Sequence, residues 1–328
     1  MKVVVHGAGG AAQVMTIGEA SIPVPASDEV QIKVAYTGIN RPDVAQRQGT
    51  YPPPPGASPF MGLEASGTVT ACGSAVTRWK VGDKVCALTN GGSYAEFVCA
   101  SQGQVLPIPQ GLNLLQAAGL PENYFTVYTN VIERGQLKKG ETILIHGGSS
   151  GIGITAIQMA KAWGAEVYCT VGSEQKRQAC LALGADAAIN YRTSNYVDEI
   201  ARLTNKRGVD VVLDMVAGPY TDQNLKCLAM DGRLVQIALL QGGKVQADIT
   251  PIMTKRLTFT GSTLRPRTPV QKAAIANSLL RDIWPLLEQG RLLPVIYKTF
   301  DFDDIVQAHL LMESSTHIGK IMVKVAGE

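Results

Sequence analysis

The chain has 328 residues, of which 45% are hydrophobic and 17% charged, and its net charge is +3. This length predicts two domains, and the composition is that of an ordered globular protein. The small net charge and the scattered basic residues argue against a nucleic-acid groove or a membrane surface. No apolar run reaches the roughly 20 residues of a membrane-spanning helix, and no signal-peptide pattern follows Met1, so we expect a cytoplasmic protein. The six cysteines include no C-x-x-C pair, so we expect reduced thiols.

The first third of the sequence predicts a mostly β domain. Alternating apolar and polar runs separated by turn residues cover residues 30–35, 65–71, 84–88 and 94–100. Residues 51–59 hold five prolines and a glycine, which excludes a helix or a central strand there. This segment is either a rigid loop or a lid over a site.

From Glu141 onward, strand and helix patterns alternate at the spacing of parallel βα units. The predicted strands cover residues 142–146, 166–171, 185–190, 209–215, 233–240 and 257–260. Six such strands predict a doubly wound parallel sheet, an α/β Rossmann domain. One long helix over 271–288 and a short αβ tail ending at 320–323 follow, and we expect the tail to return to the first domain.

A glycine-rich turn joins the first of these strands to the helix that follows it. The strand 142–146 runs into Gly147-Gly148-Ser149-Ser150-Gly151-Ile152-Gly153, and Gly164 can end the helix. Glycines allow a tight turn and close approach of a pyrophosphate, while the helix N-terminus offers free N–H groups. Ser150 stands at the middle glycine position, yet the order of strand, turn and helix predicts a dinucleotide site formed by Ser149 to Gly153. A glycine turn without a ligand is the alternative.

The end of the next strand predicts which dinucleotide binds. NAD-binding domains place an acidic residue there to hold the ribose hydroxyls. Here the strand ends in Val171-Gly172-Ser173, with Lys176 close behind. A hydroxyl and an ammonium suit the additional phosphate of NADP, which favours NADPH over NAD, although Glu174 weakens this argument and basic residues on a helix are often simply solvated.

Four segments carry a family resemblance that covers nearly the whole chain. Residues 135–153, continuing to Gln158 and Lys161, resemble the quinone oxidoreductase and zeta-crystallin signature of the medium-chain dehydrogenases/reductases. The segments 40–49, 53–58 and 62–67 are similar to the tumour-suppressor-inducible branch of that family. The resemblance implies a GroES-like, partly open β-barrel domain formed by residues 1–121 and 261–328, with the Rossmann domain at 122–260. It also implies an NADPH-dependent quinone oxidoreductase.

The same resemblance bears on metal binding. Zinc-bearing relatives have a cysteine where this chain has Asn40 and a histidine where it has Leu63. The four-cysteine lobe of those relatives is also missing, because only Cys86 lies in the corresponding region. We therefore expect no metal site, and we interpret His6, His146, His309 and His317 as structural.

Family resemblance also suggests the site residues. It implies that Asn40 and Tyr51 line the acceptor pocket, that Thr126 lies near the nicotinamide carboxamide, and that Gly172, Ser173, Lys176 and Tyr191 hold the adenosine end. Each of these three residues also has a purely structural alternative. Asn40 could hold a turn before Pro42, Tyr51 could cap the proline loop, and Thr126 could pack inside a helix. Residues that follow strand ends are expected at the nicotinamide: Ala238, Leu239, Leu240, Ser262, Thr263 and Leu264. Lys320 is a candidate ligand of the cofactor phosphates or a surface lysine, and residues 257–262 would pair across a homodimer axis.

Two competing functions remain open at this point. One is an NADPH-dependent reductase of 2-alkenals or other enones, which uses the same hydride transfer. The other is a cofactor-binding protein with a structural or RNA-binding role.

Overall fold

The computed structural model describes residues 1–326 and divides them into two compact units, which are treated separately below. Unit 1 comprises residues 1–125 and 265–328, of which 265–326 are described, and unit 2 comprises residues 126–264. Both boundaries fall later than the sequence predicts, at 125 and 265 rather than 121 and 261. No helix within residues 1–326 is both long and apolar enough to cross a membrane.

Unit 1 contains the β-rich, partly open barrel. Its strands are β1 (Lys2–Val5), β2 (Thr16–Glu19), β3 (Glu29–Ile39), β4 (Glu64–Cys72), β5 (Lys84–Leu88), β6 (Phe97–Ser101), β7 (Val105–Pro107), β14 (Ile296–Asp301) and β15 (Lys320–Lys324). Its helices are α1 (Arg41–Arg47), α2 (Leu114–Ala118), α3 (Pro121–Val127), α9 (Pro269–Asp282), α10 (Trp284–Glu288) and α11 (Ile305–Ser314), with short 3₁₀ turns η1 (Ala12–Val14), η2 (Gln102–Gln104) and η4 (Phe302–Asp304). The last two residues of α3 belong to unit 2.

Strand β3 is the centre of the barrel sheet. One edge of β3 pairs with β4 from Val30 to Thr37, and its other edge pairs with β6 near the start and with β15 near the end, all antiparallel. The C-terminal tail therefore returns to the first domain, as the sequence predicts. Because β3 ends at Ile39, the pairing brings β15 and β4 beside the residue that follows it, Asn40.

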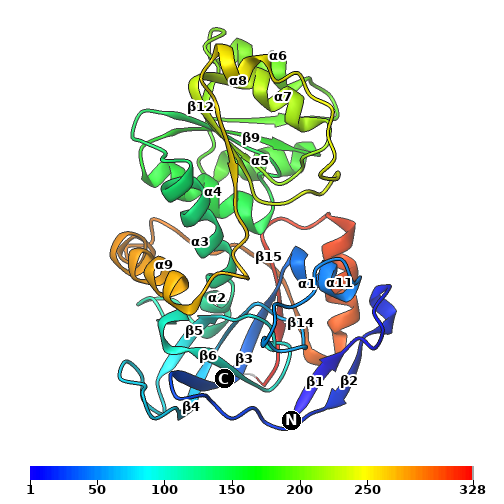
Figure 1. Cartoon of the computed structure of the whole chain (residues 1–328), viewed down its shortest axis with the longest axis vertical. Coiled ribbons are helices and arrows are strands. Elements are labelled where there is room, and N and C mark those ends of the chain that lie inside the picture. The colour runs from blue at the N-terminus through cyan, green and yellow to red at the C-terminus, as the bar shows by residue number, and fades with distance from the viewer. Residues whose placement is uncertain (327–328) are drawn as a thin grey trace. The chain divides into compact units, whose positions relative to one another are not determined.

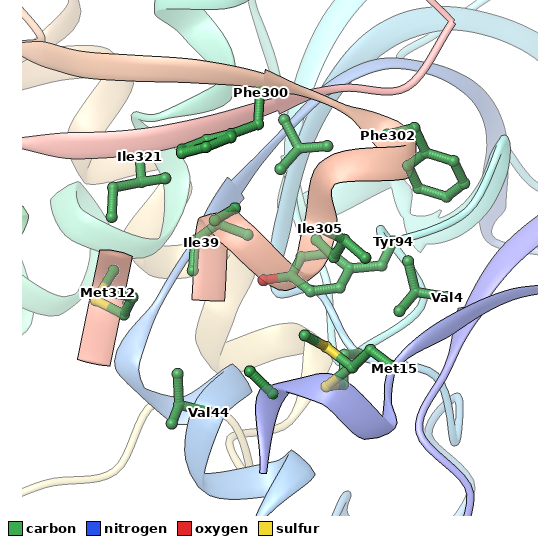
Figure 2. Packing of buried hydrophobic residues seen from close by; sticks show 14 residues of the cluster. Val4, Met15, Ile39, Val44, Tyr94, Phe300, Phe302, Ile305, Met312 and Ile321 are labelled. Atoms are coloured by element: carbon green, nitrogen blue, oxygen red, sulfur yellow. The ribbon is translucent and has the colours of Figure 1, made fainter. Parts of the chain in front are cut away.

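Unit 1 has one apolar core cluster between the barrel strands and another around α11 (Figure 2). In the cluster around α11, side chains from the N-terminal and the C-terminal segments pack together, including Val4, Met15, Phe302 and Ile305. The ring of Tyr94 lies among them and is fully buried. Burial of such side chains is the main favourable contribution to folding, and here it ties the two ends of the chain into one unit.

Unit 2 is the doubly wound sheet, and its strands alternate along the chain with helices (Figure 1). All six strands are parallel, in the order β10-β9-β8-β11-β12-β13. The elements are η3 (Tyr128–Arg134), β8 (Thr142–Ile145), α4 (Gly151–Ala162), β9 (Glu166–Val171), α5 (Glu174–Ala182), β10 (Ala187–Asn190), α6 (Tyr196–Leu203), β11 (Val209–Asp214), α7 (Tyr220–Cys227), β12 (Leu228–Gln236), α8 (Thr250–Thr254) and β13 (Thr258–Gly261).

The bounds of most predicted strands shift by a few residues in the structure, and two predicted elements differ more. The single helix expected over 271–288 is two helices, because Pro285 lacks an N–H and its ring clashes with a continuous helical backbone. The strand expected over 233–240 runs from Leu228 to Gln236, since the N–H groups of Ile237 and Leu240 bond to carbonyls at the end of β11 and beyond it and lead the chain out of the sheet.

Candidate functional site

The glycine turn of unit 2 has the geometry that a dinucleotide needs. Gly147 has φ +65°, a conformation that favours glycine. A Cβ on Gly153 would lie 2.3 Å from the carbonyl oxygen of Gly147, so this position requires glycine to let α4 approach the strand. Residues 149–153 thus form the first turn of α4 and the loop before it, and backbone N–H groups at such a helix N-terminus can bind a pyrophosphate.

Ser150 explains the departure from the usual glycine pattern. It is the N-cap of α4, with φ −71° and ψ 165°, which any residue can adopt. Its hydroxyl donates to the carbonyl of Gly147 at 2.8 Å and accepts the N–H of Gly153 at 3.0 Å. A serine therefore stabilises this turn where a glycine would leave the helix uncapped.

Polar groups also gather at the ends of β9 and β10. Ser173 caps α5 by accepting the N–H of Lys176 at 3.3 Å. A Cβ on Gly172 would lie 2.5 Å from the hydroxyl of Tyr191, so that hydroxyl packs directly against the Gly172 backbone. Burial lowers the pKa of Lys176, and the neighbouring Arg192, which the sequence analysis missed, lowers it further. The predicted residues are thus brought together, with an additional cation beside them.

The acidic residue that complicates the sequence argument is neutralised locally. Glu174 forms an ion pair with Arg177 at 2.8 Å, one turn along α5, and accepts a bond from Gln178. The carboxylate of Glu174 therefore has its own cation, distinct from Lys176.

The predicted nicotinamide-side residues of unit 2 lie beyond the ends of β12 and β13. Ala238 is half-buried, and Leu239 and Leu240 are exposed. The Ser262 hydroxyl donates to Asn130 Oδ1 at 2.8 Å, and Asn130 Nδ2 donates to the carbonyl of Thr126 at 2.8 Å. Thr126, Ser262 and Asn130 are thereby connected. Thr263 is exposed and Leu264 half-buried at the end of the unit.

Unit 1 carries a buried polar cluster at Asn40. Lys320 Nζ donates to Asn40 Oδ1 at 2.7 Å and to Glu64 Oε1 at 2.5 Å, and Asn40 Nδ2 donates to the same carboxylate oxygen at 2.9 Å. All three residues are buried: Lys320 is 4% exposed, Asn40 6% and Glu64 0%. Lys320 is therefore not a surface lysine. A contact between Lys320 and cofactor phosphates stays a prediction.

Asp43 supports this cluster from the first turn of α1. Its carboxylate accepts the backbone N–H of Asn40 at 2.8 Å and that of Gly62 at 3.0 Å. Burial raises the pKa of Asp43 to about 6, although these two N–H groups and the Tyr94 hydroxyl oppose the increase. Asp43 fixes the backbone at Asn40, a role that the sequence analysis missed, although an Asn three residues before an acidic residue, with Pro42 between them, is the spacing of a helix N-terminus.

A second set of ionisable groups surrounds Tyr51. The guanidinium of Arg265 lies over the Tyr51 ring, 5.6 Å from its centroid, and donates twice to the carbonyl of Asn90. Burial raises the pKa of Tyr51, and Glu122 raises it further. Burial, followed by the charges of Glu64 and Asp43, raises the pKa of Glu122 to about 8. Burial therefore favours the protonated forms of both Tyr51 and Glu122.

Two of the four histidines, His146 and His309, are buried and hydrogen-bonded to side chains of the protein. His146 is buried between Thr170 and Asn224, at 2.9 and 2.7 Å. His309 is buried against Arg47 and Tyr94, and burial followed by the charge of Arg47 lowers its pKa to about 3. Within residues 1–326, no three His, Cys, Asp or Glu side chains gather as metal ligands would. All six cysteines are free thiols.

Each of the two units contains a segment that matches a known protein domain. Residues 26–110 match the alcohol dehydrogenase GroES-like domain, and residues 151–278 match a domain described as zinc-binding dehydrogenase. Quinone oxidoreductase of Rattus norvegicus is 31% identical over 92% of this chain and 91% of its own length, and that of Homo sapiens is 30% identical over the same shares.

Solved structures give the same result for the fold. The Escherichia coli quinone oxidoreductase complexed with NADPH has a TM-score of 0.88, with 28% identity over 99% of both chains. The JamJ enoyl reductase has a TM-score of 0.88, with 27% identity over 98% of both chains. With a barrel unit, a doubly wound unit and relatives that match along nearly its whole length, the chain belongs to the quinone oxidoreductases of the medium-chain dehydrogenase/reductase family and is an oxidoreductase of the quinone or enoyl reductase kind.

Proposed function

We propose that this chain is an NADPH-dependent quinone reductase that transfers a hydride without a metal ion. The observation that carries the proposal is the buried cluster of Asn40, Glu64 and Lys320, at the position where zinc-bearing relatives have a ligand cysteine. Residues 151–278 match a domain of zinc-binding dehydrogenases. Whether the residues around Asn40 could hold zinc therefore decides between a metal-dependent and a metal-free mechanism.

The residues at Asn40 do not fit a zinc ion. Zinc in proteins binds thiolates, imidazoles and carboxylates. Here Glu64 is the only such group of the cluster, and its Oε1 accepts bonds from both an ammonium and an amide. A zinc ion would have to displace Lys320 and would gain no thiolate or imidazole. We therefore derive no step through a metal.

The groups at the end of β9 support NADPH as the cofactor. Backbone N–H groups of residues 149–153 would hold the pyrophosphate, and Ser173, Lys176 and Tyr191 would hold the additional phosphate. Arg192 adds positive charge nearby, and Arg177 neutralises Glu174. Similarity to an Escherichia coli quinone oxidoreductase that binds NADPH agrees with this assignment.

In the proposed reaction a quinone and a proton are converted to a hydroquinone as NADPH is oxidised to NADP⁺. The cofactor supplies the hydride when bound. Addition of a hydride to a conjugated carbonyl compound places negative charge on the acceptor oxygen. Asn40 would donate an amide N–H to that oxygen, and Tyr51 or Glu122, whose protonated forms are favoured by burial, would provide the hydrogen bond or proton that completes the reduction.

A second candidate function is the reduction of 2-alkenals or other enones. It is favoured by the similarity to the JamJ enoyl reductase, whose fold matches as well as that of the quinone oxidoreductase. The same hydride addition then forms an enolate, and protonation gives a saturated carbonyl compound.

The proposal includes a homodimer. Strand β13 is the edge of the six-stranded sheet, and Phe259 on it is 47% exposed. An exposed edge strand with an apolar side chain can pair with a second copy. Light scattering of the wild type and of Phe259→Lys tests this part, with a monomeric wild type as the contrary result.

The function is tested by measuring the rate of NADPH oxidation by protein that has been treated with a chelator to remove metal ions. An ortho-quinone, a para-quinone and a 2-alkenal are compared, each with NADPH and NADH. Turnover with a quinone and a preference for NADPH supports the proposal. Turnover confined to the alkenal assigns the second function, whereas restored activity only on adding zinc contradicts the metal-free mechanism.

A further inference from the structure

The orientation of the Asn40 side chain is fixed by two buried charges. Its carboxamide oxygen faces the ammonium of Lys320 at 2.7 Å, and its nitrogen faces the carboxylate of Glu64 at 2.9 Å. The reversed amide would place its NH₂ group against the ammonium and its oxygen against the carboxylate. Both contacts would then be repulsive in a buried site, so the ion pair allows only one orientation.

This orientation leaves one amide hydrogen of Asn40 weakly held. An asparagine has two N–H donors on its side chain, and Glu64 accepts one of them. The other described acceptor is the carbonyl of Gly38 at 3.4 Å, which is long for an N–H···O bond. A stronger acceptor, such as an oxygen that gains negative charge, can therefore take this hydrogen.

Glu64 is itself held rigidly. Its second oxygen accepts the backbone N–H of Glu122 at 2.9 Å. A Cβ on Gly38 would lie 2.1 Å from Glu64 Oε1, so the absence of a side chain on Gly38 makes room for the carboxylate. Backbone groups on both sides thus determine where the carboxylate lies, and the carboxylate in turn determines where Lys320 and Asn40 lie.

Stability alone does not account for such a pair. Removing two charges from water costs several kcal/mol per ion, and apolar replacements of buried ion pairs are often equally stable. Lys320 and Glu64 come from different strands and form their ion pair beside Asn40, whose amide takes part in the proposed reaction. The free energy lost by removing both charges from water therefore falls at a site with a proposed function.

We propose that Lys320 and Glu64 are positioning residues, which orient the Asn40 carboxamide so that its second N–H stabilises the oxyanion formed on the acceptor. The inference rests on the proposed function, because it assigns Asn40 to contact with the acceptor. It differs from the expected role of Lys320 as a phosphate ligand, since Lys320 here acts through Asn40 and not on the cofactor.

The test uses four variants of the full chain and one control. Asn40→Ala gives the full loss of the amide, which for one oxyanion donor is about 10²-fold in kcat. Lys320→Met and Glu64→Gln each leave one buried charge without its partner. The double variant Lys320→Met with Glu64→Gln leaves none. Lys324→Met, on an exposed residue of the same strand, is the matched control.

Three quantities are measured for each protein: kcat with a quinone or alkenal, the Kd of NADPH and the melting temperature. We expect the double variant to recover most of the melting temperature that the single variants lose. Its kcat should nevertheless remain reduced about 10²-fold, as in Asn40→Ala, while the Kd of NADPH changes less than about twofold. Lys324→Met should behave as the wild type.

Two outcomes of these measurements would overturn the inference, one in kcat and one in the Kd of NADPH. If kcat recovers together with the melting temperature in the double variant, the ion pair is only structural. If Lys320→Met raises the Kd of NADPH about tenfold while Glu64→Gln does not, Lys320 binds the cofactor phosphates directly.

An NMR measurement keeps the inference testable if the wild type reduces no acceptor and the proposed function fails. The side-chain amide signals of Asn40, assigned by their loss in Asn40→Ala, should be two separate, slowly exchanging resonances. They should shift and exchange faster in the double variant. Unchanged signals would show that the ion pair does not orient the amide.

Discussion

Replacing Gly38 by alanine should break the ion pair between Lys320 and Glu64 without changing any charged group. Gly38 lies in β3 opposite Met322, and its φ is not in the left-handed region, so the backbone tolerates alanine. The new Cβ would lie 2.1 Å from Glu64 Oε1 and 2.9 Å from Cδ. The carboxylate must therefore move away from its partners.

The size of this effect follows from what Glu64 holds. Its carboxylate accepts bonds from Asn40, Lys320 and the backbone of Glu122. Breaking a buried ion pair costs about 3–5 kcal/mol. For a folding unit of this size each kcal/mol lowers the melting temperature by about 2–4 °C, so we expect a decrease of about 10 °C.

Scanning calorimetry of Gly38→Ala measures the change, with Gly119→Ala as control. A Cβ on Gly119 would lie 3.4 Å from the Cγ of Lys320, an ordinary van der Waals contact with the same side chain. We expect the control to melt within about 2 °C of the wild type. A Gly38→Ala protein that is as stable as the control and retains its kcat would refute the claim that the carboxylate is confined against Gly38.

Three further predictions concern the cofactor and the buried carboxyl group. Gly153→Ala places a Cβ 2.3 Å from the Gly147 carbonyl, so the Kd of NADPH, measured by fluorescence, should rise at least about tenfold with unchanged circular dichroism; an unchanged Kd would contradict the turn geometry. Lys176→Met removes a phosphate donor worth about 1.5–3 kcal/mol, so the KM of NADPH should rise at least about tenfold while that of NADH stays within about twofold; equal changes would argue against the phosphate contact. The pKa of Glu122 is raised to about 8, so the native state binds a proton that the unfolded chain has released, and this group lowers stability as pH rises from about 4.5 to 8, by up to about 1.4 kcal/mol per pH unit. Urea unfolding of Glu122→Gln should therefore show a smaller loss of stability between pH 5 and pH 8 than the wild type, and parallel pH curves would refute the raised pKa.

The Rossmann unit could be predicted from the sequence because its signals are local. The strand, the glycine turn and the helix of residues 142–162 are contiguous, and each βα unit repeats the same pattern. The strand over 166–171 agrees residue for residue with β9. The π-helical turn η3 after α3, which places Asn130 between Thr126 and Ser262, has no comparable periodic signal.

Where the prediction erred, a single residue or a tertiary contact decided the outcome. Periodicity over 271–288 continues through Pro285, whose ring ends one helix and begins another. The apolar run after Gln236 reads as strand, but its backbone bonds to the loop after β11. Such bonds depend on the neighbouring strand, which the local sequence does not contain.

The sequence by itself determined that the chain has a strand, a glycine-rich turn and a helix in the order of a dinucleotide site, and the family resemblance added that Asn40 and Leu63 stand where zinc-bearing relatives have a cysteine and a histidine. Only the tertiary structure decided what Asn40 contacts. Its partners Glu64 and Lys320 lie 24 and 280 residues away along the chain. They meet because β3 pairs with β4 on one edge and with β15 on the other. Propensity and periodicity describe the residues within one element, whereas the pairing of distant strands is fixed by burial of the whole sheet.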